Sequence, residues 1–137
     1  MPPPEEDIRR TLARYCMFCD DGRFAELAAL FTEGGRLHAL GETRRGHEEI
    51  CAFMEHIHPP ELRGKHLGVN SVIESDGWAG TAVAWTDFVF VGQDGGVVVT
   101  GRYHDHLVRE GDKVWRFDQR EIVLRGDQPQ LGSPVPA

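Results

Sequence analysis

Four polar side chains lie where the sequence should otherwise bury apolar surface. Tyr15 and Asp20 come near the end of the first amphipathic segment, and His66 begins a strand-like run. Asp87 is enclosed in the apolar run 83–91, where an unpaired carboxylate would be costly to bury, so it needs a partner or a task. A phenol, an imidazole and two carboxylates are the groups that general acid–base catalysis uses.

The first half of the sequence predicts helices, which would carry Tyr15 and Asp20. Apolar residues recur at the helical period over positions 8–19, after a start marked by prolines and acidic residues. A second short helix is expected over 24–31, and a third over 47–56 that ends before a pair of prolines. Between them, a weakly alternating stretch leads into a turn with a glycine at each end, over 41–46.

The second half predicts long strands, which would carry His66 and Asp87. Four runs rich in β-branched and aromatic residues are separated by short hairpin sequences; they are 65–75, 78–91, 96–109 and 113–125. Successive hairpins predict an antiparallel sheet, and helices followed by strands predict an α+β fold with the helices on one face. Strands this long must twist and curl, so sheet and helices should enclose a cone with a pocket.

Composition limits the possible functions. The chain has 137 residues and a formal net charge of -7, which fits one domain over 1–125 followed by a loose proline-containing tail over 126–137. Basic residues are scattered, so nucleic-acid binding is not expected. The sequence has neither an apolar run of membrane-spanning length nor the pattern of a secretion signal at its start, so we expect a cytoplasmic protein that binds no membrane.

Two short motifs could indicate metal or redox chemistry. Cys16 and Cys19 form a C-x-x-C sequence, but they lie among the apolar residues of a helix and have no second pair at zinc spacing, so we interpret them as buried hydrophobes. His104, His106 and Glu110 match the H-x-H-x(3)-E pattern of cupin metal sites, but the glutamate falls in a turn and no partner histidine motif follows. We therefore predict neither a metal nor another cofactor.

A family resemblance follows from the order of several motifs. These are Tyr15 with Asp20, the Gly-Arg-Phe-x-x-Leu-x-x-Leu-Phe run from position 22, His-Leu-Gly-Val-Asn from 66, Gly-Arg-Tyr-His-Asp from 101, and Val-Trp-Arg-Phe from 114 followed by Arg120. Together they resemble the SnoaL-like branch of the nuclear-transport-factor-2-like superfamily over residues 5–125. The resemblance implies a cone-shaped antiparallel sheet packed on three N-terminal helices, and a homodimer formed through the outer face of the sheet.

Within that superfamily the site pattern is similar to scytalone dehydratase and bile acid 7-alpha-dehydratase. The second fits better, because the scytalone enzyme has a histidine near the position of Asp87 and a tyrosine where this chain has Cys19. The resemblance implies that His66 is the base, that Asp20 orients its ring, and that Tyr15 donates to the carbonyl or enolate oxygen. Asp87 would hold the leaving hydroxyl or support Tyr15.

We also expect four further residues to bind the substrate, namely Trp85, Phe53, Asn70 and His104. The assignment of His104 comes from the resemblance, because strand parity leaves open whether it points inward with Arg102 or whether Tyr103 and Asp105 do. His56 and His58, before the proline pair, are interpreted as loop surface, and Arg120 as a brace for carboxylates.

Each candidate also has a structural interpretation. Tyr15 could be a core residue, Asp20 an N-cap of the second helix, His66 an ordinary hydrogen-bonded histidine, and Asp87 a paired carboxylate. Three functions therefore stay open: a cofactor-independent lyase or isomerase acting on a hydrophobic ring ketone or hydroxy-ketone, a non-catalytic partner like the dioxygenase small subunit or a ligand-binding protein, and a metal-binding protein. An open pocket would favour the enzyme over the adaptor, whose cone is filled by side chains.

Overall fold

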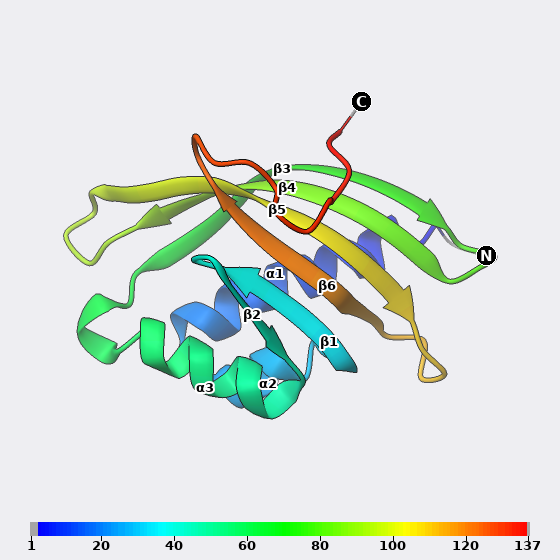
Figure 1. Ribbon diagram of the computed structural model, residues 1–137, viewed down its shortest axis with the longest axis horizontal. Coiled ribbons are helices and arrows are strands. Elements are labelled where there is room, and N and C mark those ends of the chain that lie inside the picture. The colour runs from blue at the N-terminus through cyan, green and yellow to red at the C-terminus, as the bar shows by residue number, and fades with distance from the viewer. Residues whose placement is uncertain (1–2, 137) are drawn as a thin grey trace.

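A curved six-stranded sheet wraps over the helices, which pack on its concave face (Figure 1). The computed structural model describes residues 3–136. The helices are α1 (Glu5–Asp20), α2 (Phe24–Ala28), α3 (His47–Ile57) and the 3-10 helix η1 (Pro60–Leu62). The strands are β1 (Phe31–Ala39), β2 (Glu42–Arg45), β3 (Lys65–Asp76), β4 (Thr81–Val91), β5 (Val97–Arg109) and β6 (Trp115–Leu124). The predicted α+β cone is confirmed.

The strand order is β2-β1-β6-β5-β4-β3, and the last four strands form the meander that the hairpin sequences predict. The β1–β6 pair is parallel, so the sheet is mixed rather than wholly antiparallel. Register shifts interrupt the β1–β6, β3–β4, β4–β5 and β5–β6 pairings. Such bulges bend and twist a strand, which helps the sheet to curl around the helices.

Three predicted boundaries are wrong. The strand expected from residue 78 begins at Thr81, because residues 77–80 form the turn before it. The other two concern the ends of β1. The second helix ends at Ala28 rather than near Phe31, because the chain leaves the helix to pair with β6, where Phe117 N–H donates to Leu30 O at 2.8 Å. The expected turn over 41–46 instead contains β2, which pairs with the end of β1. The hairpin between them turns at Leu40 and Gly41, whose φ angles of 54° and 77° are those that tight two-residue hairpins require.

The apolar core lies between α1 and the concave face of the sheet. Ile8 and Tyr15 of α1 pack against the layer formed by Phe31, Leu107 and Phe117. Along β4 the even-numbered residues face the helices and the odd-numbered ones face the convex side. This parity decides which of the predicted site residues can reach the interior.

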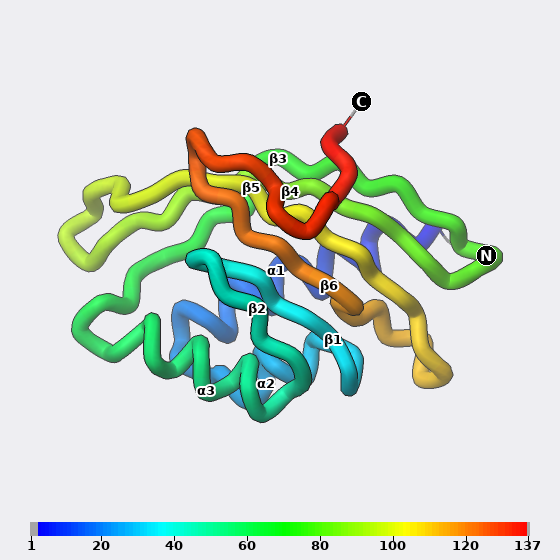
Figure 2. Tube along the Cα trace, in the orientation of Figure 1, coloured from blue at the N-terminus to red at the C-terminus, as the bar shows by residue number. Residues whose placement is uncertain are grey.

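The C-terminal segment has no helix or strand, but it is not loose, contrary to the sequence prediction. It crosses the convex face of the sheet (Figures 1 and 2), where Trp85 Nε1 donates to Pro134 O at 2.6 Å. The carboxylate of Glu121, 1% exposed, accepts from Gln130 N at 2.5 Å and from Ser133 Oγ at 3.0 Å. A buried carboxylate needs such donors, and the segment supplies them.

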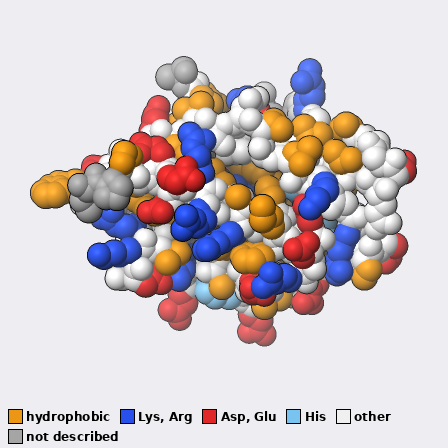
Figure 3. Space-filling view, turned by 180° about the vertical axis from the view of Figure 1, so that it is seen from behind, with side chains coloured by type: hydrophobic (Ala, Val, Ile, Leu, Met, Phe, Trp, Pro, Cys, Tyr) orange, Lys and Arg blue, Asp and Glu red, His pale blue; other side chains and the backbone are white. Residues whose placement is uncertain are grey.

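No helix within residues 3–136 has both the length and the apolar character needed to cross a membrane. Acidic and basic side chains are interspersed on the face behind that of Figure 1 (Figure 3). That face therefore presents no large patch of one charge sign.

Gly101 lies where the sheet is closely packed, and a substitution there tests this packing. At Gly101 in β5, an added Cβ would lie 2.6 Å from Val123 O and 2.7 Å from the Phe88 ring. We expect Gly101→Ala to lower the free energy of unfolding in urea by about 1–3 kcal/mol, because the strand or the ring must move. Gly111→Ala is the matched control, since no atom beyond its two chain neighbours lies within 4 Å of its added Cβ. Equal stability of the two variants would contradict the packing described.

Candidate active site

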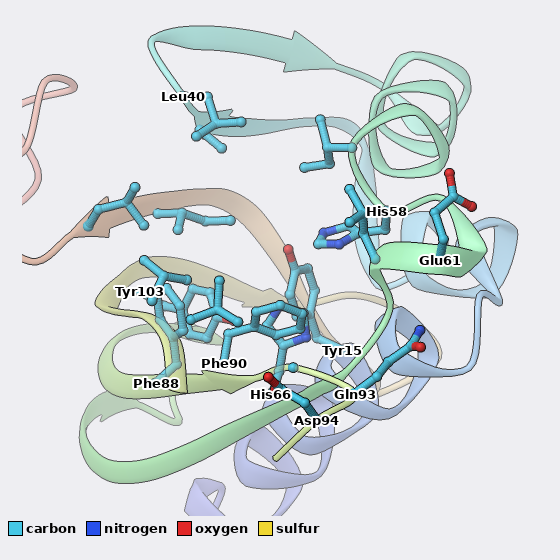
Figure 4. Close-up of a pocket in the computed structure, with 18 residues that line it drawn as sticks. Tyr15, Leu40, His58, Glu61, His66, Phe88, Phe90, Gln93, Asp94 and Tyr103 are labelled. Atoms are coloured by element: carbon cyan, nitrogen blue, oxygen red, sulfur yellow. The ribbon is translucent and has the colours of Figure 1, made fainter. Parts of the chain in front are cut away.

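A cavity of about 650 Å³ opens between the concave face of the sheet, α1 and the segment that follows α3 (Figure 4). Its walls are mostly apolar, with Phe88 and Phe90 from β4 and Ile122 from β6 among them. Polar groups enter this wall at a few points only, most closely grouped at Tyr15, His58 and His66. An apolar pocket with a few convergent polar groups is the usual form of a small-molecule site.

His66 and Asp20 form the central pair of the site. His66 is the second residue of β3, and Asp20 is the last residue of α1. One carboxylate oxygen of Asp20 lies 2.7 Å from His66 Nδ1 and also accepts the backbone N–H of His66 at 3.0 Å. If Nδ1 carries the proton, as this bond favours, Nε2 keeps its lone pair free. The imidazole is packed against the ring of Phe90, with centroids 4.5 Å apart.

Tyr15 brings a hydroxyl into the same cavity (Figure 4). Its oxygen is buried and has no hydrogen-bond partner among the described residues. Burial raises the pKa of this phenol far above its ordinary value, partly opposed by the nearby charge of Arg120, so it remains a hydrogen-bond donor at neutral pH. The helix stays regular through Asp20. Asp20 does not line this cavity; it bonds to His66, which does. The side chains of Tyr15 and Asp20 therefore need not lie on the same side of the helix.

His58 completes the polar group, although the sequence predicts it on the loop surface. It follows α3 directly and is half-buried, stacked on Phe24 and in edge contact with His66, with ring centroids 5.5 Å apart in the second case. Burial, followed by the field of His66, lowers the pKa of His58 to about 4. No periodicity could have shown this, because the burial of His58 depends on residues from α2 and β3.

The structure settles the parity of β5, which the sequence left open. Tyr103 and Asp105 face the helices, and Tyr103 lines the cavity, stacked on Phe88 with centroids 4.5 Å apart. His104 points to the convex side, where its Nδ1 lies 3.3 Å from Pro134 O. His106 shares that side. The cupin-like metal pattern therefore does not face the cavity.

Asp87 does not join the predicted site. It points to the convex side, where Arg102 Nε donates to it at 2.6 Å and the Asn70 amide at 3.3 Å. These hydrogen bonds, that of Arg102 above all, lower the pKa of Asp87. Its side chain is 34% exposed. The structural interpretation, a paired carboxylate, is therefore correct, and Asp87 can neither hold a leaving group in the cavity nor support Tyr15.

The other predicted binding residues also lie elsewhere. Asn70 shares the convex face with Asp87, and Trp85 lies beneath the C-terminal segment. Phe53 is buried on α3, where the Arg44 guanidinium covers its ring at 5.2 Å. The structure thus brings together Tyr15, Asp20 and His66, and places the remaining predicted residues outside the cavity. Trp85 and Phe53 are apolar and buried, as expected, but burial alone does not tell which cavity or face a residue occupies.

A buried ion pair supports the cavity from below. Arg120 and Asp105 have fully buried side chains and form two hydrogen bonds, of 2.7 and 2.9 Å. The Arg120 guanidinium lies 4.2 Å from the Tyr15 ring centroid and 3.8 Å from that of Tyr103. Burial lowers the pKa of Arg120, but the charge and hydrogen bonds of Asp105 outweigh it and raise this pKa overall, so Arg120 stays charged. Arg120 braces a carboxylate, as the sequence suggested, and also orders the two phenols by cation–π contact.

Comparison with known proteins identifies the family. The sequence matches the SnoaL-like domain over residues 4–121. The chain belongs to the SnoaL-like family. No curated protein matches this SnoaL-like chain.

Solved structures similar to this SnoaL-like chain share its NTF2-like fold. An NTF2-like protein with a cystatin-like fold from Novosphingobium aromaticivorans has a TM-score of 0.80 at 24% identity, covering 90% of this chain and 83% of its own. A candidate scytalone dehydratase from the same organism has a TM-score of 0.76 at 23% identity, covering 97% and 89%. ActVI-ORFA from Streptomyces coelicolor has a TM-score of 0.76 at 20% identity, covering 88% and 96%.

The buried ion pair gives a stability prediction for this SnoaL-like domain. Arg120→Met leaves Asp105 as an unpaired buried carboxylate, so we expect a loss of about 3–5 kcal/mol in the free energy of unfolding. The double variant Arg120→Met/Asp105→Val removes both charges and should be more stable than the single variant. Urea unfolding of the three proteins measures both effects. A double variant less stable than Arg120→Met would show that the unpaired charge is not the dominant cost.

Proposed function

We propose that this SnoaL-like protein is a cofactor-independent lyase or isomerase, of the dehydratase type, in which His66 is the general base. Its substrate is a small hydrophobic ring ketone or hydroxy-ketone. One observation carries the proposal: the imidazole of His66, held at 2.7 Å by Asp20, lies in the wall of an apolar cavity that also contains the unpartnered hydroxyl of Tyr15. A base and an oxygen-binding donor in one water-poor cavity are what proton abstraction next to a carbonyl needs.

The reaction can be followed atom by atom. Neutral His66 donates Nδ1–H to Asp20 and takes the proton from the carbon next to the carbonyl onto Nε2, while the C–H electron pair forms the enolate. The Tyr15 O–H donates to the enolate oxygen and stabilises its charge. The enolate then expels hydroxide from the neighbouring carbon, and the proton on Nε2 joins it as water, which restores the neutral imidazole. If the enolate is conjugated to a C=C bond, returning that proton to the far carbon of the dienolate would shift the double bond and give isomerisation instead.

The structure removes one group from this scheme. Because Asp87 lies on the convex face, we assign to His66 the proton transfer to the leaving hydroxide. The negative carboxylate of Asp20 stabilises the imidazolium that forms between the two steps, and it fixes the ring in the orientation that serves both transfers. Asp20 is therefore a positioning residue, whereas His66 and Tyr15 would contact the substrate.

The size and lining of the cavity help to choose among substrates and among the alternative functions. About 650 Å³ lies within the usual range for small-molecule sites, and the aromatic and aliphatic walls favour a hydrophobic ring compound. An adaptor of the dioxygenase-small-subunit kind should have a cone filled with side chains, so the open cavity disfavours it. A non-catalytic ligand-binding protein would need the cavity but not the His66–Asp20 pair.

The proposal is tested with a panel of fused-ring hydroxy-ketones, read by mass spectrometry for loss of water and for deuterium uptake from D₂O next to the carbonyl. We expect His66→Gln, which can still bond to Asp20, to lower turnover by about 100- to 10,000-fold, the usual contribution of a positioned base. Tyr15→Phe should also lower it, since the oxygen loses its donor.

Asp87→Asn is the matched control, because that carboxylate lies on the convex face, and it should keep the wild-type rate. Near-normal turnover by His66→Gln would remove His66 as the base. Compounds that bind to the wild-type protein but undergo neither deuterium exchange nor loss of water would support the ligand-binding alternative.

A further inference from the structure

We propose that Cys19, His58 and His66 form a binding site for a soft divalent transition-metal ion, with zinc as the best fit. The three residues come from α1, from the position after α3 and from β3. One ligand atom from each, the Cys19 sulfur and a ring nitrogen of each histidine, lies within 4.8 Å of the other two. Thiolate and imidazole are the ligands that zinc prefers.

The spacing requires only a small adjustment. Zinc bonds to sulfur and nitrogen place tetrahedral ligand atoms about 3.4–3.6 Å apart. A pair of ligand atoms at the 4.8 Å limit would therefore have to approach by about 1.2–1.4 Å. His58 is suited to move, because its ring makes no hydrogen bond within the described part of the chain. Cys19 and His66 are held more firmly, the first by the core and the second by Asp20.

The surroundings of His66 support metal binding. Asp20 holds Nδ1, so Nε2 is the nitrogen available as a ligand, and the carboxylate–histidine pair is the arrangement that commonly orients metal-bound imidazoles. Asp20 also balances charge, since one thiolate and two neutral imidazoles leave a divalent ion with a net positive charge. Two cations act on Cys19 and would oppose a bound metal cation, Arg120 first and then Arg63, whose guanidinium lies 5.4 Å from the Phe24 ring centroid.

Three protein ligands leave one tetrahedral position for a fourth. His58 and His66 both line the large cavity, so this position would be open to water or to a ligand in the cavity, as in zinc sites that are not purely structural. This site differs from the cupin-like pattern of the sequence, whose histidines face the convex side.

The metal would compete with the proposed reaction, and this one consequence rests on the proposed function. Metal coordination uses the Nε2 lone pair of His66, which the base also needs. The metal-loaded protein should therefore lose turnover, and a chelator should restore it. Binding itself does not depend on the function.

Cobalt(II) titration of the full chain under reducing conditions tests the site. We expect one equivalent to bind, with visible bands of tetrahedral cobalt and a near-ultraviolet thiolate-to-cobalt charge-transfer band, both displaced by zinc. Cys19→Ser should lose the thiolate band, and His58→Gln should lose the tetrahedral spectrum. Asp20→Asn should weaken binding by about 10- to 100-fold, the usual effect of removing an orienting partner.

Two neighbours serve as matched controls. Cys16→Ser changes the other cysteine of the C-x-x-C sequence, and His56→Gln changes the other histidine at the end of α3. Both should keep the wild-type spectrum. If Cys19→Ser does not fold, as judged by circular dichroism, His58→Gln carries the test, because its ring is only half-buried.

A wild-type protein without the thiolate band, or a band that persists in Cys19→Ser and is lost in Cys16→Ser, would overturn the proposal. Because the readout is spectral, it is independent of turnover. Cobalt bands combined with no turnover by the metal-free protein would leave the metal site standing and count against the proposed function alone.

Discussion

The hydrogen bonds between Asp20 and His66 join the end of α1 to the edge of the sheet, and the site depends on them. The carboxylate accepts from both the backbone N–H and the ring of His66, so it fixes the edge strand and the imidazole together. Its side chain is 5% exposed. A charge-assisted bond in such a place is stronger than one in water. One contact thus helps to close the cone and also sets the tautomer that leaves Nε2 free.

The second constraint is the buried charge beneath the cavity. Arg120 is enclosed by the rings of Tyr15, Tyr103 and Phe117, and its charge is compensated by Asp105. Burying two ions costs free energy that apolar packing would not, so stability alone does not explain the pair. Its geometric effect is clear, because the planar guanidinium holds two phenol rings in place on the floor of the cavity.

The two faces of the sheet have different roles. The concave face carries the cavity and its polar group, whereas the convex face carries Asp87 with Arg102 and the buried carboxylate of Glu121 under the C-terminal segment. Buried carboxylates on both faces meet the same requirement, since Asp20, Asp105 and Glu121 each accept hydrogen bonds. Polar residues that look equivalent in the sequence are thus divided between a reactive and a structural environment.

The sequence by itself determined the α+β class, the helices and the strand meander, because period and hairpin residues are local signals. The grouping of Tyr15, Asp20 and His66 was expected only from the family resemblance, because His66 lies far from the other two in the chain. The tertiary structure decided the rest. Asp87, Trp85 and His104 lie on the convex face. The alternation of side chains along a strand shows in the sequence which residues share a face, but not which face is turned inward. The positions of His58 in the site and of the C-terminal segment on the sheet both depend on contacts with residues that are distant in the chain.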